Sequence, residues 1–183
     1  MKHGHWRVLF LTATLTACEP EVIDHAPASN LIDAESASLE TGLGVWAPWF
    51  GVSVSRTPTA AREGDAGLRV EVTEPYGWGV SLDNWPGFVA APGPHRVSFW
   101  ARVTQGRSQV AEMTVIWRDA GGRELRAETV SSPALTRQWV RTARELTAPT
   151  GTERVSVAVT GAEGAPGDVI ELDVVVVQAV GVP

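Results

Sequence analysis

Two carboxylates, Glu171 and Asp173, stand two residues apart in the hydrophobic segment Asp168–Gln178 near the C-terminus. Because the side chains of a β-strand alternate between its two faces, both carboxylates point to one face of the expected strand. Paired carboxylates at a suitable separation are the acid and the base of glycoside hydrolysis. Two acids on one strand are also common at a solvated strand end or in a structural site, and we favour these interpretations over catalysis.

Other groups for catalysis are scarce. Beyond the first residues of the chain the histidines are His25 and His95, and neither lies in a pattern typical of a Cys/His or Ser/His/Asp site. No serine is surrounded by a nucleophile-elbow pattern, and the sequence has no zinc-ligand spacing and no phosphate-binding loop. We therefore expect a protein that is not an enzyme, with a small lyase or hydrolase as the minor alternative.

Tryptophan is the conspicuous residue type, since the chain has eight tryptophans and one tyrosine. A flat indole can stack on the apolar C–H face of a sugar ring, while neighbouring amide, carboxylate and guanidinium groups bind the hydroxyls. The candidate ligand-binding residues are Trp49, Tyr76, Trp78, Asp83, Asn84, Trp85, Trp100 and Arg102.

These candidates differ in how they fit the expected strands. Trp78 is in phase with the apolar residues that follow it at every second position, which favours a core position over a stacking one. Trp85 is out of phase with them and near a turn, so it is the better candidate platform. Trp100 and Arg102 share the face opposite Phe99, and they join a binding site only if that face is the concave one.

The candidates lie on, or next to, short segments of alternating apolar and polar residues separated by glycine and proline. Such segments include 68–72, 78–82, 95–103 and 111–117, and the pattern is typical of an antiparallel sandwich. Neither a helical period nor an internal repeat is evident, which argues against an α/β fold or a propeller. We expect an all-β fold, a two-sheet antiparallel jelly-roll β-sandwich of about nine or ten strands over residues 30–180.

The last segment is the most hydrophobic of the expected strands. Alternation puts one wholly apolar row on one of its faces, formed by Ile170, Leu172, Val174 and Val176. We therefore expect this strand to lie deep in a sheet and to find partners from early in the chain.

Residues 1–17 have the features of a secretory signal, with a basic start, a short apolar run and small residues. The run is too short to span a membrane. Leu15-Thr16-Ala17-Cys18 resembles the bacterial lipobox, which implies cleavage before Cys18 and a lipid anchor on it. By the same resemblance, the absence of Asp after Cys18 implies the outer membrane. The alternative is a signal peptide with an incidental cysteine; residues 18–29, rich in acids and proline, are expected to form a flexible tether.

The chain is acidic, with 15 Lys and Arg against 21 Asp and Glu and a formal net charge of −6 at pH 7. Loss of residues 1–17 would remove Lys2 and Arg7 and make the remainder more acidic still. Because nucleic acids are polyanions, an acidic domain binds them poorly, and we expect no nucleic-acid partner.

Several short motifs occur in a fixed order along the chain: Asn30–Ile32, Ser38–Gly42 with Trp46, Glu63–Val70, Pro92–Arg102, Thr136–Val140 and Glu171–Val175. Together they resemble the carbohydrate-binding modules of the cellulose- and xylan-binding jelly-roll type, within the galactose-binding-domain-like fold. The resemblance spans about Asn30 to Gln178 and implies a glycan-binding domain. It also implies a structural calcium held by Glu40, Glu63 and Asp173. The alternative is that these three are exposed acids of an acidic protein.

The sequence thus predicts an exported, lipid-anchored protein of the bacterial outer membrane. Its expected partner is a polysaccharide or another surface glycan, bound on exposed tryptophans without catalysis. The alternative is a structural or adhesin-like envelope protein that binds another protein through a face of the sandwich, because exposed aromatic residues also serve protein interfaces.

Overall fold

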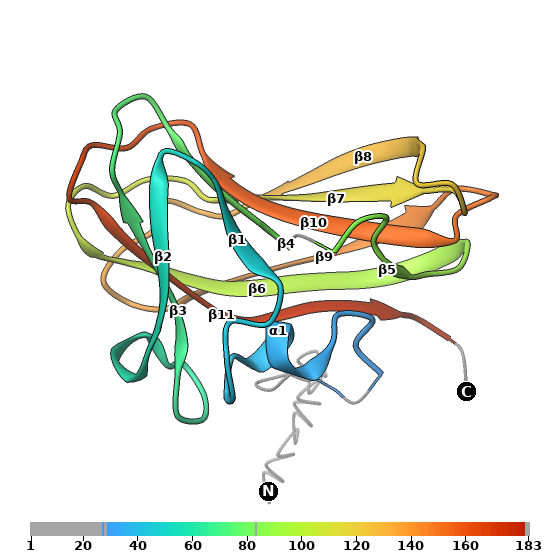
Figure 1. The fold of residues 1–183 in the computed structure, drawn as a ribbon, viewed down its shortest axis with the longest axis horizontal. Helices are drawn as coiled ribbons and strands as arrows, with labels where there is room; N and C mark the ends of the chain where they lie inside the picture. Colours follow the sequence, from blue (N-terminus) through green and yellow to red (C-terminus); the bar gives the residue numbers. More distant parts are fainter. Residues whose placement is uncertain (1–26, 28, 83, 182–183) are drawn as a thin grey trace, which may run out of the picture.

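Two antiparallel sheets, packed face to face, make up most of the chain (Figure 1). The structure is a computed structural model that describes residues 27, 29–82 and 84–181. The predicted two-sheet antiparallel sandwich is confirmed. The described residues contain eleven strands, where about nine or ten were expected.

The five-stranded sheet has the order β2-β3-β11-β6-β9, and the six-stranded sheet has the order β1-β4-β10-β7-β8 with β5 paired to β10. The strands of the five-stranded sheet are β2 (Val52–Thr57), β3 (Gly67–Val72), β11 (Val169–Ala179), β6 (Gly93–Gln105) and β9 (Val140–Ala148). Those of the six-stranded sheet are β1 (Trp46–Phe50), β4 (Trp78–Leu82), β10 (Arg154–Gly161), β7 (Glu112–Arg118), β8 (Glu124–Ser131) and β5 (Phe88–Val89). A helix, α1 (Ala34–Ser38), and a 3₁₀ turn, η1 (Pro58–Ala60), complete the described elements.

The core lies between the sheets and is built from alternate residues of their strands. Its largest buried side chains include Trp78 of β4, Trp117 of β7 and Phe99 of β6. The polar edge of each buried indole is bonded: Nε1 of Trp78 donates to Gln109 at 2.5 Å, and Nε1 of Trp117 donates to Glu128 at 2.8 Å. Burial of a large apolar side chain contributes about 3 kcal/mol, so these aromatics stabilise the sandwich.

Strand β11 lies between β3 and β6, in the middle of its sheet, as expected for the most hydrophobic strand. The predicted apolar row is wrong beyond Asp173. The pairing of β11 with β6 changes register between Asp173 and Val176, and Val174 has φ 47°, so a bulge reverses the alternation. The core residues of β11 are Ile170, Leu172, Val175 and Val177.

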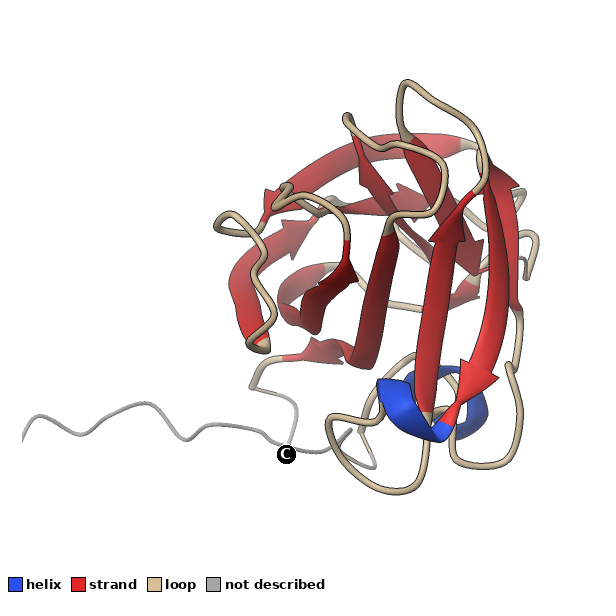
Figure 2. Ribbon diagram, turned by 90° about the vertical axis from the view of Figure 1, so that its left-hand side faces the viewer, coloured by secondary structure: helices blue, strands red, loops and turns tan. Residues whose placement is uncertain are grey.

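The start of the domain is fixed to this last strand. Nδ2 of Asn30 donates to the carbonyl of Val175 at 2.8 Å, and its Oδ1 accepts from the N–H of Val177 at 2.8 Å. Helix α1 follows, begins with Asp33 accepting from the N–H of Ser36, and packs against β11 at one end of the sandwich (Figures 1 and 2). Its five residues are too few to show a helical period, which is why the sequence did not predict it.

No helix in the described ranges is long and apolar enough to cross a membrane. Residues 1–17 and Cys18, on which the predicted signal peptide and lipid anchor depend, lie outside those ranges. The signal peptide and the anchor therefore stay predictions.

Candidate functional site

The outer face of the six-stranded sheet has small side chains at its centre. Ser81 of β4 and Ala158 of β10 are direct cross-strand partners there, and Ser156 lies two residues before Ala158 on the same face. A depression of about 160 Å³ lies over these residues. This first depression is lined by Trp49, Ser81, Leu82, Asn84, Trp85, Ile116, Arg118, Ser156, Val157 and Ala158.

A bulge in β1 puts both Trp49 and Phe50 on the outer face. The pairing of β1 with β4 changes register between Pro48 and Phe50, so Trp49 is an extra residue with no partner in the ladder. Alternation alone turns Trp49 outward like Ala47, and the extra residue turns Phe50 outward as well, opposite Gly79. The Trp49 side chain is 60% exposed and lines the first depression.

A second depression, of about 300 Å³, continues on the same face from the other side of Trp49. The rings of Trp49 and Phe50 meet edge to face with centroids 5.3 Å apart. The Phe50 ring lies over Gly79, where an added Cβ would come within 2.5 Å of it. Tyr76, in the loop between β3 and β4, completes the aromatic lining. The other lining residues are Gly77, Glu112, Thr114, Thr160, Gly161 and Ala162.

Trp85 stands at the opposite end, in the loop between β4 and β5. Its side chain is 70% exposed, but two protein groups support the ring on its inner side. Gly122, in the turn between β7 and β8, lies against the edge of the ring, and the guanidinium carbon of Arg118 lies 5.0 Å from the ring centroid. A large exposed ring with fixed support loses little freedom when a ligand stacks on it.

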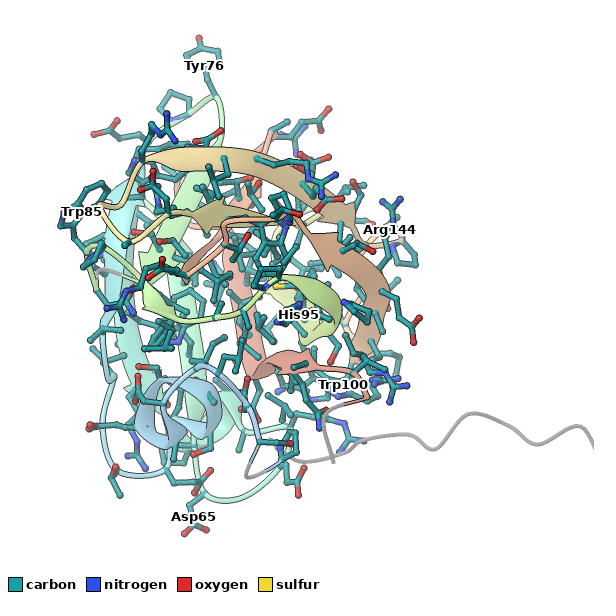
Figure 3. All side chains as sticks on the ribbon, turned by 90° about the vertical axis from the view of Figure 1, so that its right-hand side faces the viewer. Asp65, Tyr76, Trp85, His95, Trp100 and Arg144 are labelled. Atoms are coloured by element: carbon teal, nitrogen blue, oxygen red, sulfur yellow. The ribbon has the colours of Figure 1, made fainter. Side chains whose placement is uncertain are left out.

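Four exposed aromatic residues thus line the two depressions, and we call them the aromatic strip: Trp85, Trp49, Phe50 and Tyr76. Trp49 lines both depressions and so joins them into one surface. Tyr76 is 93% exposed and stands out at one end of the molecule (Figure 3).

The sequence predicted part of this surface. It named Trp49, Tyr76, Asn84 and Trp85, which the structure brings together on one face. It missed Phe50, Arg118 and the small residues of the floor. Phe50 could have been found by its place beside Trp49, but the floor depends on strands far apart in the chain.

Another candidate, Trp78, does not join the strip. Trp78 is wrong as a stacking platform, because its side chain is fully buried between the sheets. The alternation that puts Gly79 and Ser81 on the outer face turns Trp78 inward. Asp83 lies outside the described residues.

Trp100 and Arg102 are not part of this surface, because β6 belongs to the other sheet. The sequence placed them in a binding site only if their own face were the concave one. Figure 3 shows Trp85 and Trp100 on opposite sides of the molecule. The guanidinium carbon of Arg62 lies 4.4 Å from the centroid of a Trp100 ring. Arg102 pairs with Glu171 at 2.6 Å and lies over Trp139 at 4.6 Å. The two predicted residues are therefore engaged with neighbouring protein groups.

The three predicted calcium ligands lie around one loop, residues 62–65. Asp173 is fully buried; its Oδ2 accepts from the N–H groups of Arg62 and Glu63 at 2.7 and 3.1 Å, and its Oδ1 from that of Val174 at 2.8 Å. Glu40 accepts from the N–H of Asp65 at 2.8 Å. These carboxylates therefore tie the loop to β11 and to the segment after α1.

This arrangement does not fit the predicted calcium site. In the part of the chain that the structure describes, no three acidic, histidine or cysteine side chains are grouped to hold a metal ion. N–H donors point at both oxygens of Asp173, where a cation would need lone pairs. The resemblance implies calcium and these contacts argue against it, and a thermal melt with and without a chelator tests which of the two holds.

Burial makes Asp173 hard to ionise. Desolvation raises its pKa from 3.8 to about 6, against the lowering effect of the three backbone N–H donors. The negative charge of Glu40 adds to the increase. Asp173 is thus a titratable group that holds the loop of residues 62–65, and it lies on the sheet that does not carry the aromatic strip.

No family model matches the sequence, and no curated protein matches it. Solved structures do. The N-terminal family 22 carbohydrate-binding and GH10 modules of endo-1,4-β-D-xylanase 10B from Clostridium thermocellum, complexed with xylohexaose, align with TM-score 0.65 and 12% identity over 79% of this chain and 28% of that one. A family 16 carbohydrate-binding module aligns with TM-score 0.62 and 17% identity over 81% of this chain and 99% of that module.

A further match is the first family 22 xylan-binding domain of Xyn10C from Paenibacillus barcinonensis, with TM-score 0.58 and 20% identity over 80% of this chain and 94% of that domain. At these identities the similarity establishes the fold. The chain is a jelly-roll sandwich of the kind found in carbohydrate-binding modules, which confirms the predicted fold class.

Proposed function

We propose that this chain is a non-catalytic glycan-binding protein of the bacterial envelope, which stacks a sugar chain on the aromatic strip. The observation that carries the proposal is the continuous surface of two depressions joined at Trp49. Each depression combines exposed aromatic rings with a floor of small residues. The structural similarity to xylan-binding and other carbohydrate-binding modules supports the same function.

The chemistry of this surface suits a sugar chain. Rings such as Trp85 and Trp49 offer flat apolar platforms to the C–H faces of sugars. Hydroxyl groups would find donors and acceptors beside the platforms, in Asn84, Ser156 and Glu112. Because both depressions are open rather than enclosed, a polymer can lie along the strip without a deep pocket closing around one end of it.

The envelope location is a separate part of the proposal and rests on the lipobox-like run that ends at Cys18. The domain starts at Asn30, whose side chain is bonded to β11, in the sheet that does not carry the strip. An extended tether of residues 18–29 would span about 40 Å. That reach leaves the strip accessible to glycans at the surface of an outer membrane.

Affinity electrophoresis tests the binding function. The full-length chain is run in gels that contain xylan, galactan, glucomannan or soluble cellulose derivatives, and we expect retardation by at least one of them. Trp85→Ala and Trp49→Ala are each expected to weaken binding about tenfold or more, as for a central interface aromatic. Trp100→Ala is the matched control, because it removes the same ring from the other sheet.

A different result would favour the alternative of an adhesin-like protein. If no glycan retards the chain while it is correctly folded, the strip is more consistent with a protein interface, since exposed aromatic residues also serve those. Metabolic labelling with a fatty acid tests the anchor: the label should appear in the wild-type chain and be absent from Cys18→Ser.

A further inference from the structure

We propose that the Trp85 end of the first depression binds the anionic group of an acidic sugar, through Arg118. This inference rests on the proposed function and names the class of glycan, a chain that carries carboxylate or sulfate groups. Arg118 is the last residue of β7, and its side chain lines the depression between Trp85 and the floor.

The guanidinium of Arg118 is held in place with one nitrogen left over. Its Nε donates to the hydroxyl of Ser156 at 3.3 Å, and its Nη1 donates to the carbonyl of Gly122 at 2.9 Å. The Trp85 ring covers one of its faces at 5.0 Å. Among the described residues, Nη2 has no hydrogen-bond acceptor. A fixed guanidinium of this kind is a pre-organised donor for a ligand.

Its charge is not neutralised by the described part of the protein. The cross-strand neighbours of Arg118 are Glu124 on β8 and Arg154 on β10. Glu124 is exposed and forms no ion pair with Arg118, and neither does any other described carboxylate. The adjacent acid, Asp119, is instead paired with Arg123 at 3.0 Å.

Arg154 brings a second positive charge next to Arg118 on the same face, although it does not line the first depression. It stands directly opposite Arg118 in register, and because Val155 and Trp117 both point into the core, alternation puts the two arginines on the outer face. The Nε of Arg154 is buried and has no hydrogen-bond partner among the described residues. Like charges directly opposite each other in a sheet are destabilising, so a bound anion would offset their repulsion.

An acidic sugar satisfies both features of this end of the strip. Carboxylate and sulfate oxygens accept short, charge-assisted hydrogen bonds from a guanidinium, which are stronger than those to a hydroxyl. Trp85 supplies a platform for the ring that carries the anion. A neutral sugar would use the same platform but leave Arg118 without an anionic partner.

Matched pairs of polymers test the proposal by titration calorimetry on the full-length chain. The pairs are xylan and glucuronoxylan, methyl-esterified and free polygalacturonate, and hydroxyethyl cellulose and β-1,4-polyglucuronate. Cellulose sulfate is added to distinguish sulfate from carboxylate. We expect at least one charged member to bind about tenfold tighter than its neutral partner and to weaken as ionic strength rises.

Variants assign the effect to Arg118. Arg118→Gln should weaken binding of the charged polymer about tenfold more than that of the neutral one, which loses only the support of Arg118 under Trp85, whereas Arg118→Lys should retain part of the preference. The control is Arg144→Gln, the same change of charge at an exposed residue on the other side of the molecule from Trp85 (Figure 3). Equal affinity for the charged and neutral members of every pair, or equal losses for both in Arg118→Gln, would overturn the proposal while leaving glycan binding intact. Absence of binding in every arm would remove both.

Discussion

Gly122 lies against the edge of the Trp85 ring, so that a Cβ on Gly122 would come within 2.7 Å of Trp85 Cζ2 and 3.0 Å of Pro86 Cβ. The turn between β7 and β8 therefore sets the position of an exposed ring that comes from the loop between β4 and β5. Gly122 also has φ 83°, a region that residues with a Cβ rarely adopt. Two loops distant in sequence thus build one end of the aromatic strip.

Replacement of this glycine should disturb binding by displacing Trp85. Gly122→Ala introduces the clash with the ring, which is free to move outward because it is mostly exposed. We expect glycan affinity to fall about tenfold, as for loss of a central aromatic contact. The positive φ adds a stability loss of about 1 kcal/mol. Affinity electrophoresis measures the first effect and chemical denaturation the second.

Gly151→Ala provides the control for backbone strain. Gly151 has φ 88°, close to that of Gly122, but its nearest neighbour for an added Cβ is Leu125 at 3.9 Å, an ordinary contact. Both variants should therefore lose similar stability, and only Gly122→Ala should lose affinity. Equal affinities for the two variants would contradict the supporting role of Gly122.

Trp49 and Trp78 should behave in opposite ways when each is replaced by alanine. Trp78 is fully buried and bonded to Gln109, so its loss leaves a core cavity and should cost about 3 to 5 kcal/mol. Trp49 is 60% exposed, and its loss should change stability by less than about 1 kcal/mol while weakening glycan binding. Urea denaturation of the two variants makes the comparison, and similar losses of stability would contradict the assignment of Trp49 to the surface.

The phase of the strands could be predicted from the sequence wherever the alternation is regular. Trp78 shares the phase of buried apolar residues, and that signal favoured the core position in which the structure has it. The two-sheet fold follows from the same pattern, since every apolar face needs a partner. The phase fails at bulges, because one extra residue reverses it: this happens at Val174 in β11 and at Trp49 in β1.

The site was less predictable, because strand order decides which residues meet. Arg118, Ser156 and Ser81 come from β7, β10 and β4, which are neighbours in the sheet but distant in the chain. Trp100 was a candidate as well as Trp85, yet its strand belongs to the other sheet. Local patterns say which side chains share a face of one strand, and only the sheet order says which faces are joined.

Removal of calcium should leave the stability of the domain unchanged. The oxygens of Asp173 already accept three backbone hydrogen bonds, and Glu40 accepts one from Asp65. We therefore expect thermal midpoints in calcium and in a chelator to agree within about 1 °C, given that 1 kcal/mol corresponds to about 2 to 4 °C for a domain of this size. A midpoint several degrees higher in calcium, lost in Asp173→Asn, would show instead that the acids rearrange around the ion.

Protonation of Asp173 should stabilise the domain as the pH falls into mild acid. Its pKa is about 6 in the folded protein and 3.8 in the unfolded chain, so between these values the folded state binds the extra proton. The sign follows: the contribution of Asp173 to the free energy of unfolding increases as the pH falls from 7 through 6 and reaches its full value below about 4. The difference of roughly two pH units corresponds to about 3 kcal/mol at most.

Asp119 acts in the opposite direction, because its hydrogen bonds with Arg123 lower its pKa. The comparison must therefore be made with Asp173→Asn, which lacks the titrating group and keeps the other acids. Urea denaturation at several pH values from 4 to 7 should show wild type gaining about 2 to 3 kcal/mol relative to the variant as the pH falls. Glu40→Gln should shift this gain to lower pH, because the charge of Glu40 helps to raise the pKa of Asp173. Parallel profiles for wild type and Asp173→Asn would contradict the elevated pKa, whatever the constant offset between them.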